Sequence, residues 1–300
     1  MTTDSSPDPV PGQASGVGSP DASSRRGVRS RTMQTITVRK PTFDWPTDLP
    51  LLPFPDDVSR SCEMVAGSFT LPYVEPYLIR TMRVAAKEVE DPQLAADMKA
   101  FSQQEAQHFK NHAAINDIVR AQLSPAGAEA MRALEDGLEA DYRRFTDTKS
   151  LAFNLAYAEG FEATALHAAR SIRIADTEAI DRTWGDLWYW HLAEEIEHRT
   201  VIFDAYDHIV GRYAYRTAVG SWGQAHFLGF ALRMAAVLQS DHYGEPIPLR
   251  RVAAQSAKRS WAVGTVQGGI KALLPNYNPR KVEIDDESRV VASMYGVELD

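Results

Sequence analysis

Two short stretches of this 300-residue chain carry the same pattern, a glutamate followed three positions later by a histidine. The first pair is Glu105 with His108, and the second is Glu195 with His198. On an α-helix, residues three apart lie on one face, so each pair would direct a carboxylate and an imidazole to one point. Mixed oxygen and nitrogen donors suit a divalent metal ion. The repeat therefore predicts two helices that face each other across a metal centre.

A lone glutamate precedes each of these pairs. Glu75 precedes the first pair, and either Glu159 or Glu162 precedes the second. Helical bundles that hold two metal ions take one carboxylate from each of two further helices, so this order fits a duplicated two-helix unit. A single Glu-x-x-His would be explained as well by a solvated helix face. For Glu159, which has apolar neighbours, the alternative to a metal is an arginine partner such as Arg80 or Arg170.

Further polar residues lie one turn from the two pairs. His112 follows the first pair and His191 precedes the second, each on the same helical face as its pair. They are candidates for extra metal ligands, for groups that orient a ligand, or for hydrogen-bonded core histidines. Glu194 and Glu197 flank the second pair on other faces, which indicates a supporting or surface role.

The pattern of apolar residues predicts an all-α protein. Asp91 before Pro92 and Ser124 before Pro125 are typical helix starts, and Gly211 is placed to end a long helix. No hairpin turn lies between alternating segments. The fold expected is a ferritin-like helical bundle with additional C-terminal helices. The predicted helices cover residues 59–70, 72–90, 92–122, 126–146, 149–173, 177–212, 215–239 and 248–273.

Composition divides the chain into four parts. Residues 1–34 are rich in Ser, Pro, Gly and Asp and are expected to form a disordered tail. Residues 35–58 alternate prolines with large apolar side chains, which indicates an extended arm packed on the body. Residues 59–280 form the expected helical metal-binding domain, and 281–300 an irregular or partly helical C-terminal tail. The apolar run at 218–239 is interrupted by polar residues, so we expect no stable membrane span.

Charge and cysteine content exclude several classes of function. The net charge of −8 argues against nucleic acid or an anionic membrane as a partner. With Cys62 as its only cysteine, the chain can form neither a disulfide framework nor a thiolate-rich metal site, and this cysteine is read as a buried hydrophobe. The N-terminus has no apolar signal region, and no apolar run follows Arg25 and Arg26, so a cytoplasmic location is expected.

From about residue 37 to 280 the chain resembles bacterial proteins described as predicted metal-dependent hydrolases. The family's glutamate with a phenylalanine two positions later corresponds to Glu159, so the resemblance implies Glu159 rather than Glu162 as a ligand. The chain departs from the family in lacking a glycine before Glu75 and in having Asn278 where a histidine often precedes the proline. The matching stretches are VRKPTFDWP, the Pro-x-x-Glu of LPYVEPYLIR, QEAQHFKNH, AYAEGF, WHLAEEIEHRTVIFDAY and LLPNYNP.

Six carboxylate and imidazole ligands without cysteine suit two divalent metal ions, with iron expected first and manganese as the alternative. The activity expected first is that of a di-iron oxidase or oxygenase acting on a small-molecule organic substrate. The alternatives are a hydrolase that uses a metal-activated water and a non-enzymatic metal-binding bundle. A redox partner and a homodimer both stay open. The expected metal ligands are Glu75, Glu105, His108, Glu159, Glu195 and His198.

Overall fold

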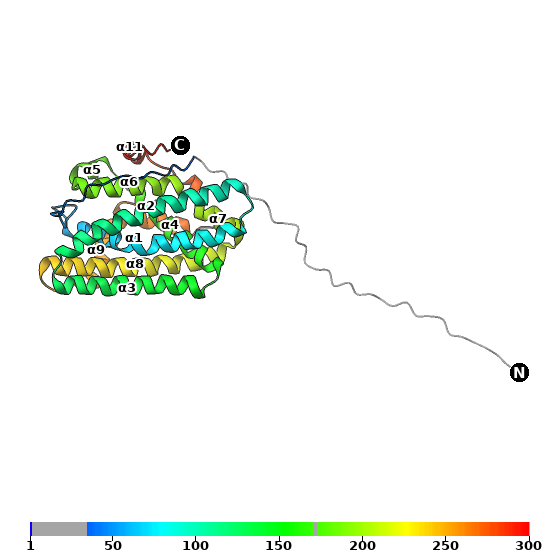
Figure 1. Cartoon of the computed structure of the whole chain (residues 1–300), viewed down its shortest axis with the longest axis horizontal. Helices are drawn as coiled ribbons and strands as arrows, with labels where there is room; N and C mark the ends of the chain where they lie inside the picture. The colour runs from blue at the N-terminus through cyan, green and yellow to red at the C-terminus, as the bar shows by residue number, and fades with distance from the viewer. Residues whose placement is uncertain (2–34, 171–172, 300) are drawn as a thin grey trace.

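The computed structural model describes residues 1, 35–170 and 173–299 of the chain, and Figure 1 shows their arrangement. Within these residues the chain forms α-helices, short 3-10 helices and loops, and no strand, which confirms the all-α prediction. The tail expected at residues 1–34 lies, apart from its first residue, outside the described part. The helices are α1 (Val58–Ala85), η1 (Ala86–Glu88), α2 (Pro92–Gln122), α3 (Pro125–Thr148), α4 (Leu151–Ala169), α5 (Ile174–Ala179), α6 (Arg182–His198), α7 (Val201–Ile209), α8 (Tyr213–Tyr243), α9 (Leu249–Ala262), α10 (Thr265–Ala272), η2 (Pro279–Lys281) and α11 (Asp286–Met294).

The predicted helix starts at Pro92 and Pro125 are confirmed. The Asp91 side chain accepts hydrogen bonds from the backbone N–H groups of the first turn of α2, and Ser124 does the same for α3. A proline at the first helical position loses nothing, because its missing N–H would have no partner inside the helix. Gly211 has a φ of +59° and lies between α7 and α8, where it ends the preceding helix as expected.

Helix α1 continues through two prolines, whereas the sequence predicted a break near residue 71. Pro72 has no N–H, so the carbonyl oxygen of Ser68 loses its usual partner within the helix. The side-chain nitrogen Nδ2 of Asn116, on α2, donates to that oxygen at 2.9 Å. A side chain of the neighbouring helix thus replaces the lost bond, and the helix passes the proline without ending.

The single helix predicted over 177–212 is divided in the structure. Asp181 interrupts it, because its side chain accepts hydrogen bonds from Thr183 and Trp184 and so starts α6 as a new helix. A second break follows His198, and α7 begins at Val201. The predicted helix over 248–273 is likewise divided, and the expected C-terminal tail contains a full helix, α11.

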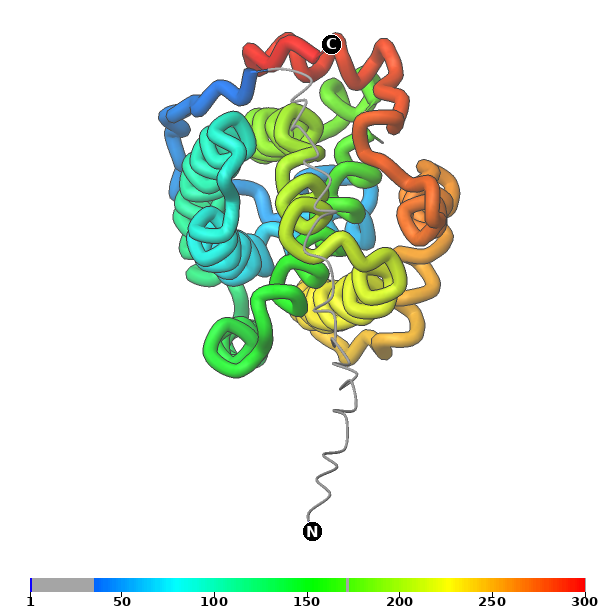
Figure 2. The backbone as a smooth tube through the Cα atoms, turned by 90° about the vertical axis from the view of Figure 1, so that its right-hand side faces the viewer, coloured from blue at the N-terminus to red at the C-terminus, as the bar shows by residue number. Residues whose placement is uncertain are grey.

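Helices α1, α2, α6 and α4 form a closed ring in which each packs against two neighbours. Helices α3 and α8 lie together on one side of this ring, while α5 and α11 lie on the other side, beside α6 (Figure 1). Figure 2 looks along the helices and shows the ring from its end, with the C-terminal segment crossing above α6. The ring places four helix faces around one buried interior. A ferritin-like arrangement beyond this stays a prediction.

A close approach of two helices fixes the rotation of α4 against α8. The two helices meet at Gly160 and Gly220, where a Cβ atom added to Gly160 would lie 2.6 Å from the backbone of Gly220. Only a residue without a side chain fits such a contact. One turn before Gly220, Arg216 is therefore brought against α4.

Residues 35–57 form a non-helical arm that runs alongside the ring. Asp181 donates its backbone N–H to the carbonyl of Pro53 at 2.7 Å, and the Trp184 indole donates to that of Pro50 at 2.8 Å. The ring of Phe43 packs against that of Trp190. The arm is therefore tied to α6 along its length. No helix in the described part of the chain is long and apolar enough to cross a membrane.

Candidate metal centre

The two Glu-x-x-His pairs meet in the interior of the ring. Glu105 and His108 come from α2, Glu195 and His198 from α6, and all four are at most 2% exposed. One donor atom of each lies within 4.8 Å of one donor atom of every other. The Nε2 atom of His198 is 3.1 Å from Oε1 of Glu105, and Nδ1 of His108 is 3.8 Å from Oε1 of Glu195. Each imidazole therefore faces the carboxylate of the other pair.

A second set of donors adjoins the first and shares His108 with it. Glu75 of α1 and His191 of α6 complete this set, again with donor atoms within 4.8 Å of one another. The Nε2 atom of His191 lies 3.6 Å from Oε1 of Glu75 and 3.0 Å from Oε1 of Glu195. His191, predicted as either a ligand or a supporting residue, is thus directed at the carboxylates.

His112 lies behind His191, one layer further from the carboxylates. Its Nε2 is 2.9 Å from Nδ1 of His191, and its Nδ1 is 2.8 Å from the hydroxyl of Ser68. That hydroxyl also donates to Oδ1 of Asn116 at 2.6 Å. Both ring nitrogens of His112 are therefore engaged, which favours the orienting role over the ligand role considered from the sequence.

Glu162, rather than Glu159, is the α4 carboxylate that faces the cluster. Its Oε2 lies 3.4 Å from Nδ1 of His198. Glu159 instead binds Arg216 of α8, with 2.6 Å between Oε1 and NH1. The structure does not bring Glu159 to the cluster. The close glycine contact between α4 and α8 brings an arginine to it, as in the ion-pair alternative, although the partner is neither Arg80 nor Arg170.

Several buried donor atoms of the cluster have no hydrogen-bond partner among the described residues. An unpartnered polar atom in a protein interior is costly, so such a concentration points to a bound ligand. Carboxylate oxygens and imidazole nitrogens are the donors that iron, manganese and zinc accept. The donor set therefore fits divalent metal ions. The atoms are both side-chain oxygens of Glu75 and Glu105, Oε1 of Glu162, Oε2 of Glu195, Nδ1 of His108 and both ring nitrogens of His198.

The electrostatics of the cluster lead to the same interpretation. Burial, followed by the charges of Glu105 and Glu195, raises the pKa of Glu75 well above its usual range. Burial and the charge of Glu195 raise the pKa of Glu162 to about 8, against the opposing effect of His198. Carboxylates that disfavour one another's ionisation are stabilised by a cation between them.

Glu194 holds His108 from the side opposite the cluster. Its Oε2 lies 3.0 Å from Nε2 of His108, and its Oε1 accepts from Arg39 at 3.1 Å. Arg39 also donates to Glu197 at 2.9 and 3.1 Å and to the carbonyl of Gly296 at 2.7 Å. The supporting role predicted for Glu194 thus has a structural basis, and one guanidinium joins the N-terminal arm, α6 and the C-terminal segment.

Sequence reasoning overlooked Arg39, Ser68 and Asn116 as parts of this site, and also Gln104, whose amide donates to Oε2 of Glu197 at 2.6 Å. Arg39 lies in the stretch VRKPTFDWP, which carried the family resemblance and so offered a signal. The others lie on the helices that carry the donors, but only their neighbours in space reveal their role.

Comparison with known proteins gives a match to a protein family. A family model described as a predicted metal-dependent hydrolase matches residues 37–283, which include Arg39 and every donor described above. No curated protein and no solved structure matches the chain. The match confirms the resemblance seen in the sequence. It supports the hydrolase alternative better than the oxidase or oxygenase that the sequence analysis placed first.

Proposed function

The chain belongs to the family described as predicted metal-dependent hydrolases, and from this premise we propose that it is a hydrolase with two divalent metal ions in its buried cluster. The observation that carries the proposal is the group of buried carboxylate and imidazole atoms, drawn from α1, α2, α4 and α6, that lack hydrogen-bond partners within the described part of the chain. Iron and manganese are the metals proposed, because the donors are oxygen and nitrogen without sulfur.

The donors divide into two overlapping sets. Glu105, His198 and Glu195 would hold one ion, and Glu75 with His191 would hold the other, while His108 is close to both sets. Glu162 adds a carboxylate on the His198 side. When bound, divalent ions polarise an ester or phosphate oxygen and lower the pKa of a water molecule.

The surrounding residues set the state of the imidazoles. Glu194 would accept a hydrogen bond from the N–H at Nε2 of His108. The lone pair of Nδ1 is then directed at the cluster. On the other side, Ser68 holds Nδ1 of His112, and Nε2 of His112 in turn contacts Nδ1 of His191, so that Nε2 of His191 faces Glu75 and Glu195. These contacts supply the fixed orientation that a metal site needs before the metal arrives.

The test combines metal analysis with two activity assays on the same preparation. We expect about two metal ions per chain by elemental analysis. The loaded protein should hydrolyse members of a panel of nitrophenyl carboxylate and phosphate esters, lose this activity on chelation, and regain it when iron or manganese is restored. Oxygen consumption should be measured in parallel with small organic substrates.

The outcomes separate the three functions considered. Ester hydrolysis that follows metal content supports the proposal. Oxygen consumption without hydrolysis would replace it with the oxidase, and metal binding without either activity would favour a metal-binding module. A purified protein that contains no metal and takes up none would remove the metal centre itself.

A further inference from the structure

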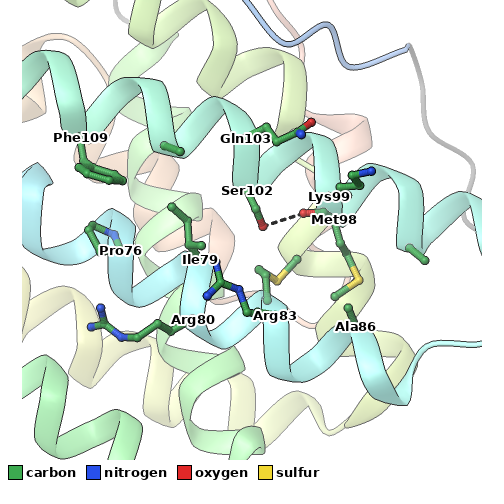
Figure 3. Close-up of a pocket in the computed structure, with 13 residues that line it drawn as sticks. Pro76, Ile79, Arg80, Arg83, Ala86, Met98, Lys99, Ser102, Gln103 and Phe109 are labelled. Carbon is green, nitrogen blue, oxygen red and sulfur yellow. Dashed lines mark hydrogen bonds between the residues drawn. The ribbon is translucent and has the colours of Figure 1, made fainter.

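A groove of about 780 Å³ lies between α1 and α2 (Figure 3). Its walls come from these two helices and from Ala86 just beyond α1. Eight of its thirteen lining residues are apolar, and none is acidic. The groove opens to solvent, because Arg83 and Lys99 on its walls are exposed. A small molecule could therefore enter it without any rearrangement of the fold.

One end of the groove lies level with the candidate metal ligands. Pro76 follows Glu75 in α1, and Phe109 follows His108 in α2, so the groove and the cluster share the same helical turns. In Figure 3, Pro76 and Phe109 lie at one end of the groove and Lys99 at the other. The ends are roughly 10 to 15 Å apart, at about 1.5 Å per residue along each helix.

The charged side chains that line the groove are all cationic. Arg80, Arg83 and Lys99 line it, and none of them forms an ion pair with a described residue. The guanidinium of Arg80 has a single weak contact, 3.5 Å from the hydroxyl of Thr146. Burial and the nearby Arg143 lower the pKa of Arg80, so its surroundings disfavour the charge that an anion would stabilise. The groove is therefore lined by positive charge although the chain as a whole has a net charge of −8.

A second cavity, of about 350 Å³, shows the contrast. It lies among α1, α4, α5, α6, α8 and α9, and its charged residues are already paired with one another. Arg60 binds Asp176 at 2.7 Å, and Arg259 binds Glu63 at 3.2 Å. The charges of that cavity are therefore already paired, whereas Arg83 and Lys99 of the α1–α2 groove form no ion pair with a described residue.

We propose that the α1–α2 groove binds an organic anion with an apolar chain. The anionic group lies between Arg83 and Lys99, and the chain runs along Ile79 toward Pro76 and Phe109. A carboxylate and a phosphate monoester share this chemistry. That this anion is the substrate rests on the proposed function. The substrate would then be an ester that carries an anionic group at one end. An apolar chain would separate this group from the bond that is cleaved.

Binding is tested without reference to catalysis. Decanoate, decyl phosphate and decanol are titrated calorimetrically into the metal-loaded full chain, into the double variant Arg83→Gln with Lys99→Gln, and into Arg132→Gln. Arg132 is an exposed arginine of α3 outside the groove, and so serves as a control for the loss of surface charge.

We expect both anions to bind at least about fivefold more tightly than decanol. A preference of this size corresponds to the modest contribution that exposed ion pairs make to a binding free energy. The double variant should lose that preference, and the control should keep it. The tighter of the two anions identifies the head group. Equal binding of decanol, or a double variant that retains the preference, would overturn the proposal.

The substrate assignment has its own readout. Water adds across the acyl C–O bond of a nitrophenyl ester and releases a carboxylic acid and nitrophenol, with no redox change. The ratio of kcat/KM for the nitrophenyl hemiester of a long dicarboxylic acid to that for a neutral nitrophenyl ester should exceed one. It should fall at least about fivefold in the double variant. An unchanged ratio, with anion binding intact, would overturn the substrate assignment alone. Absence of hydrolysis of both esters would instead count against the proposed function.

Discussion

The Nε2 atom of His108 lies 3.0 Å from Oε2 of Glu194, and the second oxygen of that carboxylate lies 3.1 Å from NH1 of Arg39. A residue of the N-terminal arm is thus connected to a candidate metal ligand through a single carboxylate. All three side chains lie in or beside the buried interior. The arm therefore has a direct physical route by which it influences the metal centre.

Substituting Arg39 should weaken metal binding although Arg39 touches no metal. In Arg39→Met, Glu194 loses its partner and holds His108 less firmly, so we expect the metal affinity to fall about 10- to 100-fold. The metal affinity of Arg39→Lys should lie between those of the wild type and Arg39→Met, because one ammonium group cannot replace the forked contacts to both Glu194 and Glu197. Competition with a chromophoric chelator measures the affinity. Lys40→Met, at an exposed neighbour, is the control, and equal affinity in all variants would show that the connection has no effect.

Removing either histidine of the duplicated pattern should remove metal. We expect His108→Ala and His198→Ala to lose most of their bound metal and to melt at lower temperature than the loaded protein, because a bound metal stabilises the folded state by mass action. His242→Ala, at an exposed position, should keep both metal and melting temperature. Metal content and circular dichroism are measured together, so that loss of metal is distinguished from loss of fold. Full metal in both cluster variants would mean that the pattern is not a metal site.

The two α4 carboxylates should behave differently. Glu162→Gln should lower metal content, because it removes a charged oxygen donor facing His198. Glu159→Gln should leave metal content unchanged and lower the stability by about 3 kcal/mol, since it leaves the buried Arg216 without its counter-ion. Elemental analysis and urea unfolding of both variants provide the comparison. Loss of metal in Glu159→Gln with full metal in Glu162→Gln would instead identify Glu159 as the metal ligand, as the sequence predicted.

Stability on the acid side should depend on His167. This histidine of α4 is buried, and burial first, then Arg170 and Lys271, lower its pKa to about 4. The unfolded chain keeps a value of about 6.5, so it binds the proton first as the pH falls from 6.5 to 4. The free energy of unfolding should therefore decrease by about 2 to 3 kcal/mol through that window because of this residue alone.

Urea unfolding at several pH values between 7 and 4 tests this dependence. His167→Leu should flatten the decrease, whatever its effect on stability at pH 7, and His242→Leu should leave the decrease as in the wild type. An equally steep decrease in His167→Leu would assign the acid sensitivity to other groups.

Local patterns were sufficient to predict helix α2 and the shared helical face of each Glu-x-x-His pair. Glu105 and His108 share a helical face whatever surrounds them, and so do Glu195 and His198, which is why their spacing could be interpreted directly. Helix α2 likewise begins at Pro92 because Asp91 caps it, and both residues are adjacent in the sequence.

The remaining features depend on contacts between distant segments. Whether Glu159 or Glu162 faces the cluster depends on the rotation of α4, which the contact with Gly220 and Arg216 on α8 decides. The continuation of α1 through Pro72 depends on a hydrogen bond from Asn116 on another helix. No pattern within one segment carries this information.

The guanidinium of Arg39 donates to the carbonyl of Gly296, near the far end of the sequence, as well as to the carboxylates that support His108. During synthesis the arm leaves the ribosome before all of the donor helices, whereas Gly296 leaves after them. The support around His108 can therefore be completed only when translation has passed that residue. The order in which the segments are synthesised therefore places the completion of this contact network after the synthesis of every donor helix.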